Sequence, residues 1–222
     1  VIVVATGGRD SKPSAYLYGS DRRVLTQQEF EARLAGGSGL AGVGSLVMIQ
    51  CVGSREPGHP YCSRVCCNTA VKNALRVKQL SPDTQIHILY RDVRTYGLNE
   101  DYYRQARQKG ILFVRYDLER KPTVAGGKTL RVEVRDPITG QDVVLNPDLV
   151  VLSARIEINA GSDVLQKMLK VPLNADGYFL EAHVKLRPVE LRPRACLWPA
   201  WRIRQRTSPR PLRRPRPPPP GR

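Results

Sequence analysis

The sequence contains no long run of apolar residues. Its longest stretches, such as residues 148–154, fall far short of the roughly 20 residues that a membrane-spanning helix needs. No charged and then apolar leader precedes a cleavage site either, so we expect a cytoplasmic protein without a membrane span. Hydrophobic residues still make up 41% of the 222 positions, which is ordinary for a globular protein with a buried core.

The sequence also lacks an initiating methionine and any visible internal repeat. Val1 already lies in the strand-like run VIVVAT, so we expect the chain to be a fragment of a longer protein. Without repeats, the architecture has to be inferred from the order of strand and helix signals along the chain.

From Leu191 onward the chain has no Lys, Asp or Glu, but it holds ten arginines, nine prolines and both tryptophans. Those arginines carry most of the formal net charge of +16 and leave +6 for residues 1–190. Such a tail can bind nucleic acid, act as an extended linker, or arise from a GC-rich gene read out of frame. We favour the third interpretation, because the composition changes at one point and no periodic apolar pattern follows. The nucleotide sequence tests it.

Strand and helix signals alternate along residues 1–190. The expected strands are continuous apolar runs, and the expected helices have an apolar face or a capping box such as that of Thr26 and Glu29. We expect strands at 1–6, 45–52, 84–93, 111–117 and 148–154, helices at 26–36, 66–80 and 99–110, and a hairpin at 129–145. This order predicts an α/β fold, a Rossmann-like doubly wound sheet with an antiparallel hairpin insertion.

Four of the five cysteines lie within seventeen positions, between the strand that ends near Gln50 and the helix that begins near Cys66. In a dinucleotide-binding unit, a Gly-x-Gly-x-x-Gly turn occupies this place and presents a helix N-terminus to a pyrophosphate. Only Gly53 and Gly58 are present here, at the wrong spacing. We therefore do not expect a nicotinamide cofactor in this loop.

The cysteine spacing is Cys-x10-Cys-x3-Cys-Cys, formed by Cys51, Cys62, Cys66 and Cys67. Four thiolates suit an iron–sulfur cluster or a structural zinc, and unligated thiols are a third alternative. The paired knuckles typical of zinc sites are absent, and disulfides are disfavoured in a reducing cytosol. Because adjacent helical residues diverge by about 100°, ligation by both Cys66 and Cys67 requires one of them to lie in a frayed first turn.

Charged residues near the cysteines allow two interpretations. Arg55 and Arg64 either place positive charge beside the sulfurs or are ordinary surface arginines. Asp92 follows a strand end, where ligand contacts are common in such sheets, and the alternative is a structural ion pair with an arginine.

Several segments closely resemble the A subunit of heterodisulfide reductase and its relatives: residues 48–56, 59–75, 90–97 and 100–115. The likeness covers about residues 1–190. It implies a thioredoxin-reductase-like flavoprotein with a partial FAD/NAD(P)-binding fold, which carries FAD and one [4Fe-4S] cluster. The cluster ligands that it implies are Cys51, Cys62, Cys66 and Cys67, whereas Cys196 receives no role.

The resemblance also bears on the flavin. Residues 5–7 look like the Ala-Thr-Gly stretch that closes the FAD domain in this superfamily, so the backbone of Thr6 and Gly7 would contact FAD in a complete protein. The Gly-rich FAD loop would lie before Val1, and the last flavin-contacting strand is replaced by the tail. We therefore expect the isolated chain to hold FAD weakly and to be inactive.

The implied domain organisation has four parts. Residues 1–45 form the end of the FAD-binding domain and a connecting segment, 46–155 form the Rossmann-like inserted domain with the cysteine loop, 156–190 return to the FAD-binding domain, and 191–222 form a disordered Arg/Pro-rich tail. The implied function is that of an electron-transfer oxidoreductase component, which relays electrons between flavin and the clusters of partner subunits. Those partners would be heterodisulfide reductase-like, hydrogenase or dehydrogenase subunits, and no nucleic acid is expected.

The alternative function is a zinc-stabilised binding module whose basic tail contacts nucleic acid. No general acid, base or nucleophilic triad stands out in the sequence, so we assign no catalytic residue. Proton chemistry would then belong to the cofactor.

Overall fold

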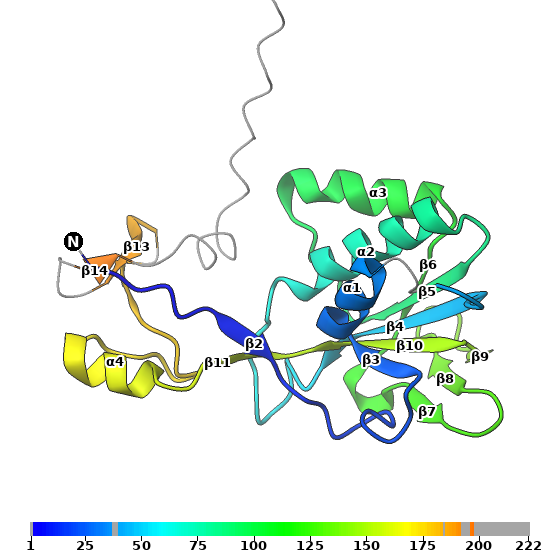
Figure 1. The fold of residues 1–222 in the computed structure, drawn as a ribbon, viewed down its shortest axis with the longest axis horizontal. Helices are drawn as coiled ribbons and strands as arrows, with labels where there is room; N and C mark the ends of the chain where they lie inside the picture. The colour runs from blue at the N-terminus through cyan, green and yellow to red at the C-terminus, as the bar shows by residue number, and fades with distance from the viewer. Residues whose placement is uncertain (1, 37–39, 184, 192–195, 198–222) are drawn as a thin grey trace, which may run out of the picture.

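The computed structural model describes residues 2–36, 40–183, 185–191 and 196–197. Two parts are visible in Figure 1: a larger part around a parallel sheet, and a smaller part that contains helix α4 (Ser162–Leu169) and both ends of the described chain. Strands β2 (Gly8–Asp10) and β11 (Ile156–Ile158) run between them as an antiparallel pair. Within these residues, no helix is long and apolar enough to cross a bilayer.

The larger part is built on five parallel strands in the order β3-β10-β4-β5-β6. Their bounds are Val24–Thr26 for β3, Ser45–Val52 for β4, Gln85–Tyr90 for β5, Leu112–Arg115 for β6 and Leu149–Ala154 for β10. The central strands β4 and β10 are buried on both faces along nearly their whole length. This explains why their sequences are continuous apolar runs without alternation.

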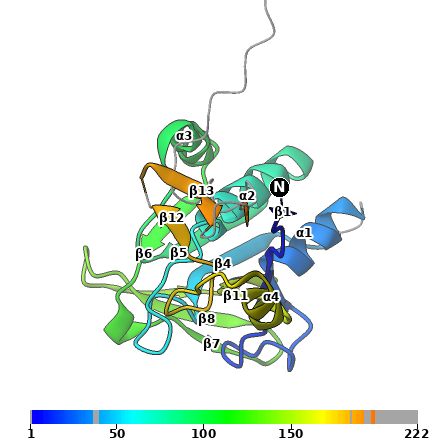
Figure 2. The same ribbon diagram turned by 90° about the vertical axis from the view of Figure 1, so that its left-hand side faces the viewer.

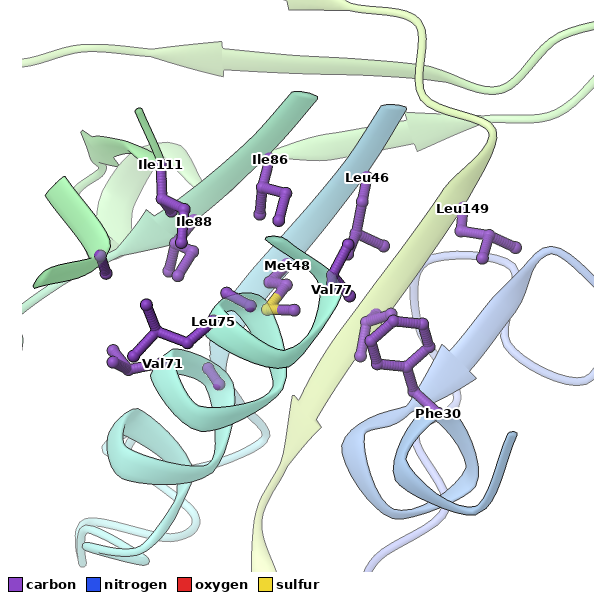
Figure 3. Packing of buried hydrophobic residues seen from close by; sticks show 14 of the residues in the cluster. Phe30, Leu46, Met48, Val71, Leu75, Val77, Ile86, Ile88, Ile111 and Leu149 are labelled. Carbon is purple, nitrogen blue, oxygen red and sulfur yellow. The ribbon is translucent and has the colours of Figure 1, made fainter. Parts of the chain in front are cut away.

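Three helices cover one face of this sheet: α1 (Gln27–Ala35), α2 (Cys66–Leu80) and α3 (Glu100–Gln108), which follows the 3-10 turn η1 (Gly97–Asn99). The predicted capping box is present, because Thr26 Oγ1 accepts from Glu29 N and Glu29 Oε2 accepts from Thr26 N. Figure 3 shows Phe30 of α1, Val77 of α2 and Met48 of β4 among the residues of one buried cluster. The helices predicted from the sequence are confirmed within one or two residues at each end.

The opposite face is covered by a three-stranded antiparallel sheet, β7-β8-β9. The hairpin of β8 (Arg131–Arg135) and β9 (Asp142–Leu145) is the predicted insertion, and β7 (Thr123–Ala125) joins it after the 3-10 turn η2 (Leu118–Arg120). Val132 and Val134 of β8 pack with Leu152 of the parallel sheet. Both faces of the sheet are thus covered, as the predicted α/β class requires.

The smaller part has a separate core made by Val4, Val171, Tyr178, Phe179 and Leu191. Its sheet has the order β1-β14-β13-β12, with bounds Ile2–Val3 for β1, Glu181–His183 for β12, Arg187–Leu191 for β13 and Cys196–Leu197 for β14. The strand expected at residues 1–6 is shorter than predicted: among the described residues, β1 pairs with β14 at two positions. Of the tail that was predicted from residue 191, all but Leu191 and the short strand β14 lies outside the described residues.

Candidate metal centre

The four clustered cysteines lie where the central strand passes into a helix. Cys51 is the penultimate residue of β4, Cys66 and Cys67 open α2, and Cys62 lies in the loop between them. This is the carboxyl end of a parallel sheet, the edge at which open α/β folds bind ligands. The sequence predicted this placement correctly.

Three of these thiols are buried. Cys51 is 5% exposed, Cys66 and Cys67 are each 6% exposed, and Cys62 is partly exposed. All four are free cysteines. Burial removes thiols from solvent, and four thiols in one loop are the donor set that soft metals and iron–sulfur clusters prefer.

The backbone of the loop is unusual at three positions. Cys51, Arg55 and Arg64 have φ values of 60°, 59° and 62°, in the left-handed region that residues with a Cβ seldom adopt. Each such residue costs about 1–3 kcal/mol and persists only where the surroundings hold it. Strain of this kind gathers at ligand sites, which supports a binding role for the loop.

The thiols affect one another's ionisation. A side-chain hydrogen bond to Cys67, reinforced by burial and by the nearby Cys51 and Cys62, raises the pKa of Cys66 well above its usual value. The same bond outweighs burial and lowers the pKa of Cys67 to about 7, with help from the backbone N–H of Arg94. Burial, followed by the charge of Cys67, raises the pKa of Cys51. The structure therefore brings the four predicted ligands into one neighbourhood.

The side chains do not form a finished ligand sphere. Within residues 2–36, 40–183, 185–191 and 196–197, no three Cys, His, Asp or Glu side chains converge as a group able to hold a metal ion. Ligation by all four thiols consequently requires a rearrangement of the loop side chains, and the ligand assignment stays a prediction.

Next to the thiols in sequence, two amide side chains have buried polar atoms without partners. Gln50, which precedes Cys51 and is 1% exposed, has neither its Nε2 nor its Oε1 hydrogen-bonded in the described structure, and the same holds for Oδ1 of Asn68, which follows Cys67. A buried polar group without a partner costs about 1–3 kcal/mol. Of these atoms, Gln50 Nε2 is a donor and suits a cluster, because hydrogen bonds donated to the sulfurs are part of iron–sulfur sites, whereas Oδ1 of Asn68 can only accept. The four thiols and the nearby amide of Gln50 therefore have the chemistry that an iron–sulfur cluster requires of its ligands and neighbours.

A partly buried ion pair joins the loop to the next strand. Arg55 Nη2 lies 2.6 Å from Asp92 Oδ2, and Arg55 Nη1 lies 4.0 Å from Cys51 Sγ. Burial would raise the pKa of Asp92, but the charges and hydrogen bonds of Arg55 and Arg94 outweigh it and lower that pKa. The Cys67 thiol also donates to the Asp92 carbonyl at 3.7 Å. The ion pair considered as an alternative for Asp92 is thus present, and it places positive charge next to a thiol.

The residues predicted to contact FAD lie elsewhere. Thr6 and Gly7 are in the segment between β1 and β2, and both are partly exposed. The Thr6 carbonyl accepts a hydrogen bond from Asn159 Nδ2 at 2.5 Å, and Gly7 has a φ of 62°. Their role toward flavin stays a prediction.

A cavity of about 330 Å³ lies beside the loop, with Cys62 on its wall. Sequence reasoning missed it, because its walls come from the loop, from Arg94 after β5, and from residues 156–178 of the smaller part. Three arginines line the cavity, but they are separated in the sequence and only the fold brings them together, so the sequence alone did not predict a site there.

Comparison with known proteins gives sequence relatives but no family profile, since the chain matches none. It is 41% identical over 194 residues to the second iron-sulfur A subunit of CoB–CoM heterodisulfide reductase in Methanopyrus kandleri, covering 79% of this chain and 29% of the relative. It is 36% identical over 211 residues to the A subunit of the H(2)/formate:CoB-CoM heterodisulfide,ferredoxin reductase of Methanococcus maripaludis, covering 86% and 32%. The chain thus spans about a third of the length of these curated relatives.

Solved structures agree on the fold. The thioredoxin reductase of Lactococcus lactis matches with a TM-score of 0.54 at 16% identity, covering 89% of this chain and 55% of that chain. The thioredoxin reductase of T. acidophilum matches with a TM-score of 0.50 at 15% identity and the same coverage. These likenesses confirm the predicted Rossmann-type α/β fold.

Proposed function

Because this chain is related in sequence to part of the A subunits of heterodisulfide reductases, we propose that it is the segment of an electron-transfer flavoprotein that holds a [4Fe-4S] cluster. The proposed ligands are Cys51, Cys62, Cys66 and Cys67. The observation that carries the proposal is the gathering of these thiols, most of them buried, at the carboxyl end of β4 and the start of α2.

The surroundings of the thiols support an anionic ligand set. Helix α2 begins at Cys66, and its N-cap residue Val65 makes no side-chain capping bond, so the positive end of the helix faces the thiols at the start of the helix. Arg55 lies 4.0 Å from the Cys51 sulfur. Positive charge of this kind favours thiolates, which are the form that binds metals.

When bound, a [4Fe-4S] cluster supplies one-electron transfer. The chain would set the potential through its own groups: burial lowers the local dielectric, the guanidinium of Arg55 favours the reduced state, and the amide Nε2 of Gln50 offers a hydrogen bond to sulfur. No residue is assigned a proton-transfer role.

The complete protein would relay electrons between FAD, contacted by the backbone of Thr6 and Gly7, and the clusters of partner subunits in the cytoplasm. The names of the relatives mention ferredoxin, H2 and formate, and one calls its protein an iron-sulfur subunit. We extend this to oxidoreductase activity, with heterodisulfide reductase-like, hydrogenase or dehydrogenase subunits as partners.

Anaerobic reconstitution with iron and sulfide tests the cluster. We expect a brown protein with broad absorbance near ~400 nm and about four iron atoms per chain. Cys51→Ala, Cys62→Ala, Cys66→Ala and Cys67→Ala should each lower the iron content, whereas Cys196→Ala is the matched control and should not. Stoichiometric zinc without visible colour would support the zinc-stabilised module instead, and a chain that binds neither metal would overturn both.

A further inference from the structure

The cavity beside the cysteine loop lies between the two parts of the molecule. Its volume of about 330 Å³ is within the range of small-molecule sites, about 300–1,000 Å³. One wall is formed by the loop and the other by the smaller part, which faces the viewer in Figure 2. Of the four clustered thiols, only Cys62 lines it, so the cavity is a neighbour of the thiol group rather than its centre.

The charge of the cavity is positive. Three arginines line it, Arg55, Arg64 and Arg94, against one acidic residue, Asp176, and outside the lining Asp92 pairs with two of these arginines. Two of these arginines, Arg55 and Arg64, are held in the left-handed backbone conformation. A pocket with this excess of guanidinium groups attracts anions, because guanidinium pairs with carboxylate and phosphate oxygens through two parallel hydrogen bonds.

Arg94 is the best placed of the three to bind a ligand. Arg55 is already committed to Asp92 at 2.6 Å. In the described structure, the only hydrogen bond of the Arg94 guanidinium is a long one, 3.4 Å from Nη2 to the same carboxylate, and its side chain is 30% exposed. A ligand anion could therefore engage Arg94 at the loss of one weak contact.

Two aromatic rings give the cavity a rigid, less polar wall. Tyr61 and Tyr178 pack edge to face, with ring centroids 5.9 Å apart. Both hydroxyls donate to the carbonyl of Ile156, at 2.9 Å and 2.7 Å. The ring–ring contact and the two hydroxyl hydrogen bonds hold the rings in place, and the rings add carbon atoms to the cavity wall beside the arginines.

We propose that this cavity binds a small molecule that carries a phosphate or carboxylate group. Arg94 is the main anchor for the anion, Arg55 and Arg64 add positive potential, and Tyr61 and Tyr178 contact the less polar portion. Cys62 is the one proposed cluster ligand on the cavity wall, so the test below is also run on a variant that should not assemble the cluster.

Calorimetric titration of the full chain with inorganic phosphate and, separately, with citrate tests the proposal. Ionic strength is held constant, because added salt screens the arginine charges and would by itself change the measured affinity. We expect saturable binding of at least one probe at one site per chain. Arg94→Ala should weaken this binding about tenfold. Arg94→Lys should weaken it less, because lysine keeps the positive charge but cannot form the two parallel hydrogen bonds of a guanidinium group. Asp176→Asn should tighten binding about threefold, because it removes the opposing charge. Arg22→Ala, at an exposed arginine outside the cavity, is the matched control and should leave the affinity unchanged.

Arg94→Ala and Asp176→Asn are expected to change the affinity in opposite directions, and the comparison of Arg94→Ala with Arg22→Ala distinguishes binding at the cavity from attraction to the positive surface in general. Binding of phosphate alone identifies phosphate compounds, and binding of citrate alone identifies carboxylates. If neither probe saturates, or if Arg94→Ala and Arg22→Ala weaken binding equally, the proposal is overturned. Repeating the titration on Cys51→Ala, which should not assemble the cluster, keeps the two proposals apart: anion binding should persist there.

Discussion

The larger and the smaller part of this chain are stabilised in different ways. The larger part buries two clusters of apolar side chains, one on each face of a five-stranded parallel sheet. Among the described residues, the smaller part has one core of five buried residues and strands of two to five residues. The cysteine loop and the cavity lie between the two. The proposed chemistry is therefore located where the larger core meets the smaller one.

The largest expected effect is in the core of the larger part. Phe30→Ala should lower the free energy of unfolding by about 3–5 kcal/mol, because it opens a cavity at a residue that is 0% exposed. Met168→Ala in the smaller part, at a residue 72% exposed, should change it by less than about 0.5 kcal/mol. Urea unfolding measures both, and equal effects would contradict the burial of Phe30 in the core of the larger part.

The next effect concerns the contact between the parts. Tyr61→Phe or Tyr178→Phe alone should cost about 0.5–1 kcal/mol, because the Ile156 carbonyl keeps one of its two donors. The double variant should cost more than the sum, about 2–3 kcal/mol in total, because the carbonyl then loses both. A double-mutant cycle by urea unfolding measures the coupling. Strict additivity would show that the two hydroxyls do not act on a shared acceptor.

A third prediction concerns the unpaired amide at the end of β4. Gln50→Leu should raise the free energy of unfolding of the metal-free chain by about 1–2 kcal/mol, because it replaces an unsatisfied buried amide by an apolar side chain of similar size. In the cluster-loaded protein, the same variant should lower the reduction potential, since it removes hydrogen-bond donors to sulfur. Destabilisation of the metal-free chain would show that the amide has a partner.

The smallest expected effect is the pH dependence of the link between β5 and the loop. The pKa of Asp92 is lowered in the folded chain, so the stability it contributes is present above the ordinary value of 3.8 and is lost as the pH falls through the folded pKa. Because this carboxylate is half exposed, solvent screening limits the contribution to less than about 1 kcal/mol. In urea unfolding, the Asp92→Asn variant should therefore lose slightly less stability than the wild type between pH 6 and pH 3. An identical decline would remove the ion pair as a source of stability.

Much of the larger part could be predicted because its signals are local. The runs at 45–52 and 148–154 are apolar throughout, as strands buried on both faces must be, and the capping box of Thr26 and Glu29 marks the start of α1. The position of the thiols followed from the same reasoning, since a loop between β4 and α2 must lie at the carboxyl end of the sheet.

The rest depends on contacts between distant residues. Strand β1 pairs with residues 196–197, and the cavity combines Arg94 with residues 156–178, so no local pattern announces either. The left-handed backbone at Cys51 is set by the packing around it rather than by its residue type. One signal was available and was missed: Gln50 is the amide inside the apolar run SLVMIQCV, and a polar side chain in such a run needs a partner.

The path of the chain between the two parts has a mechanical consequence. The described backbone crosses from one part to the other through β2 and β11, which are joined by three paired positions from Ile156↔Asp10 to Ile158↔Gly8. A double tether of this kind resists torsion, because twisting would shear the ladder, and it leaves bending as the softest relative displacement. The arginine-lined cavity has residues from both parts on its walls, so bending at the β2–β11 pair is the displacement that would widen or narrow the cavity.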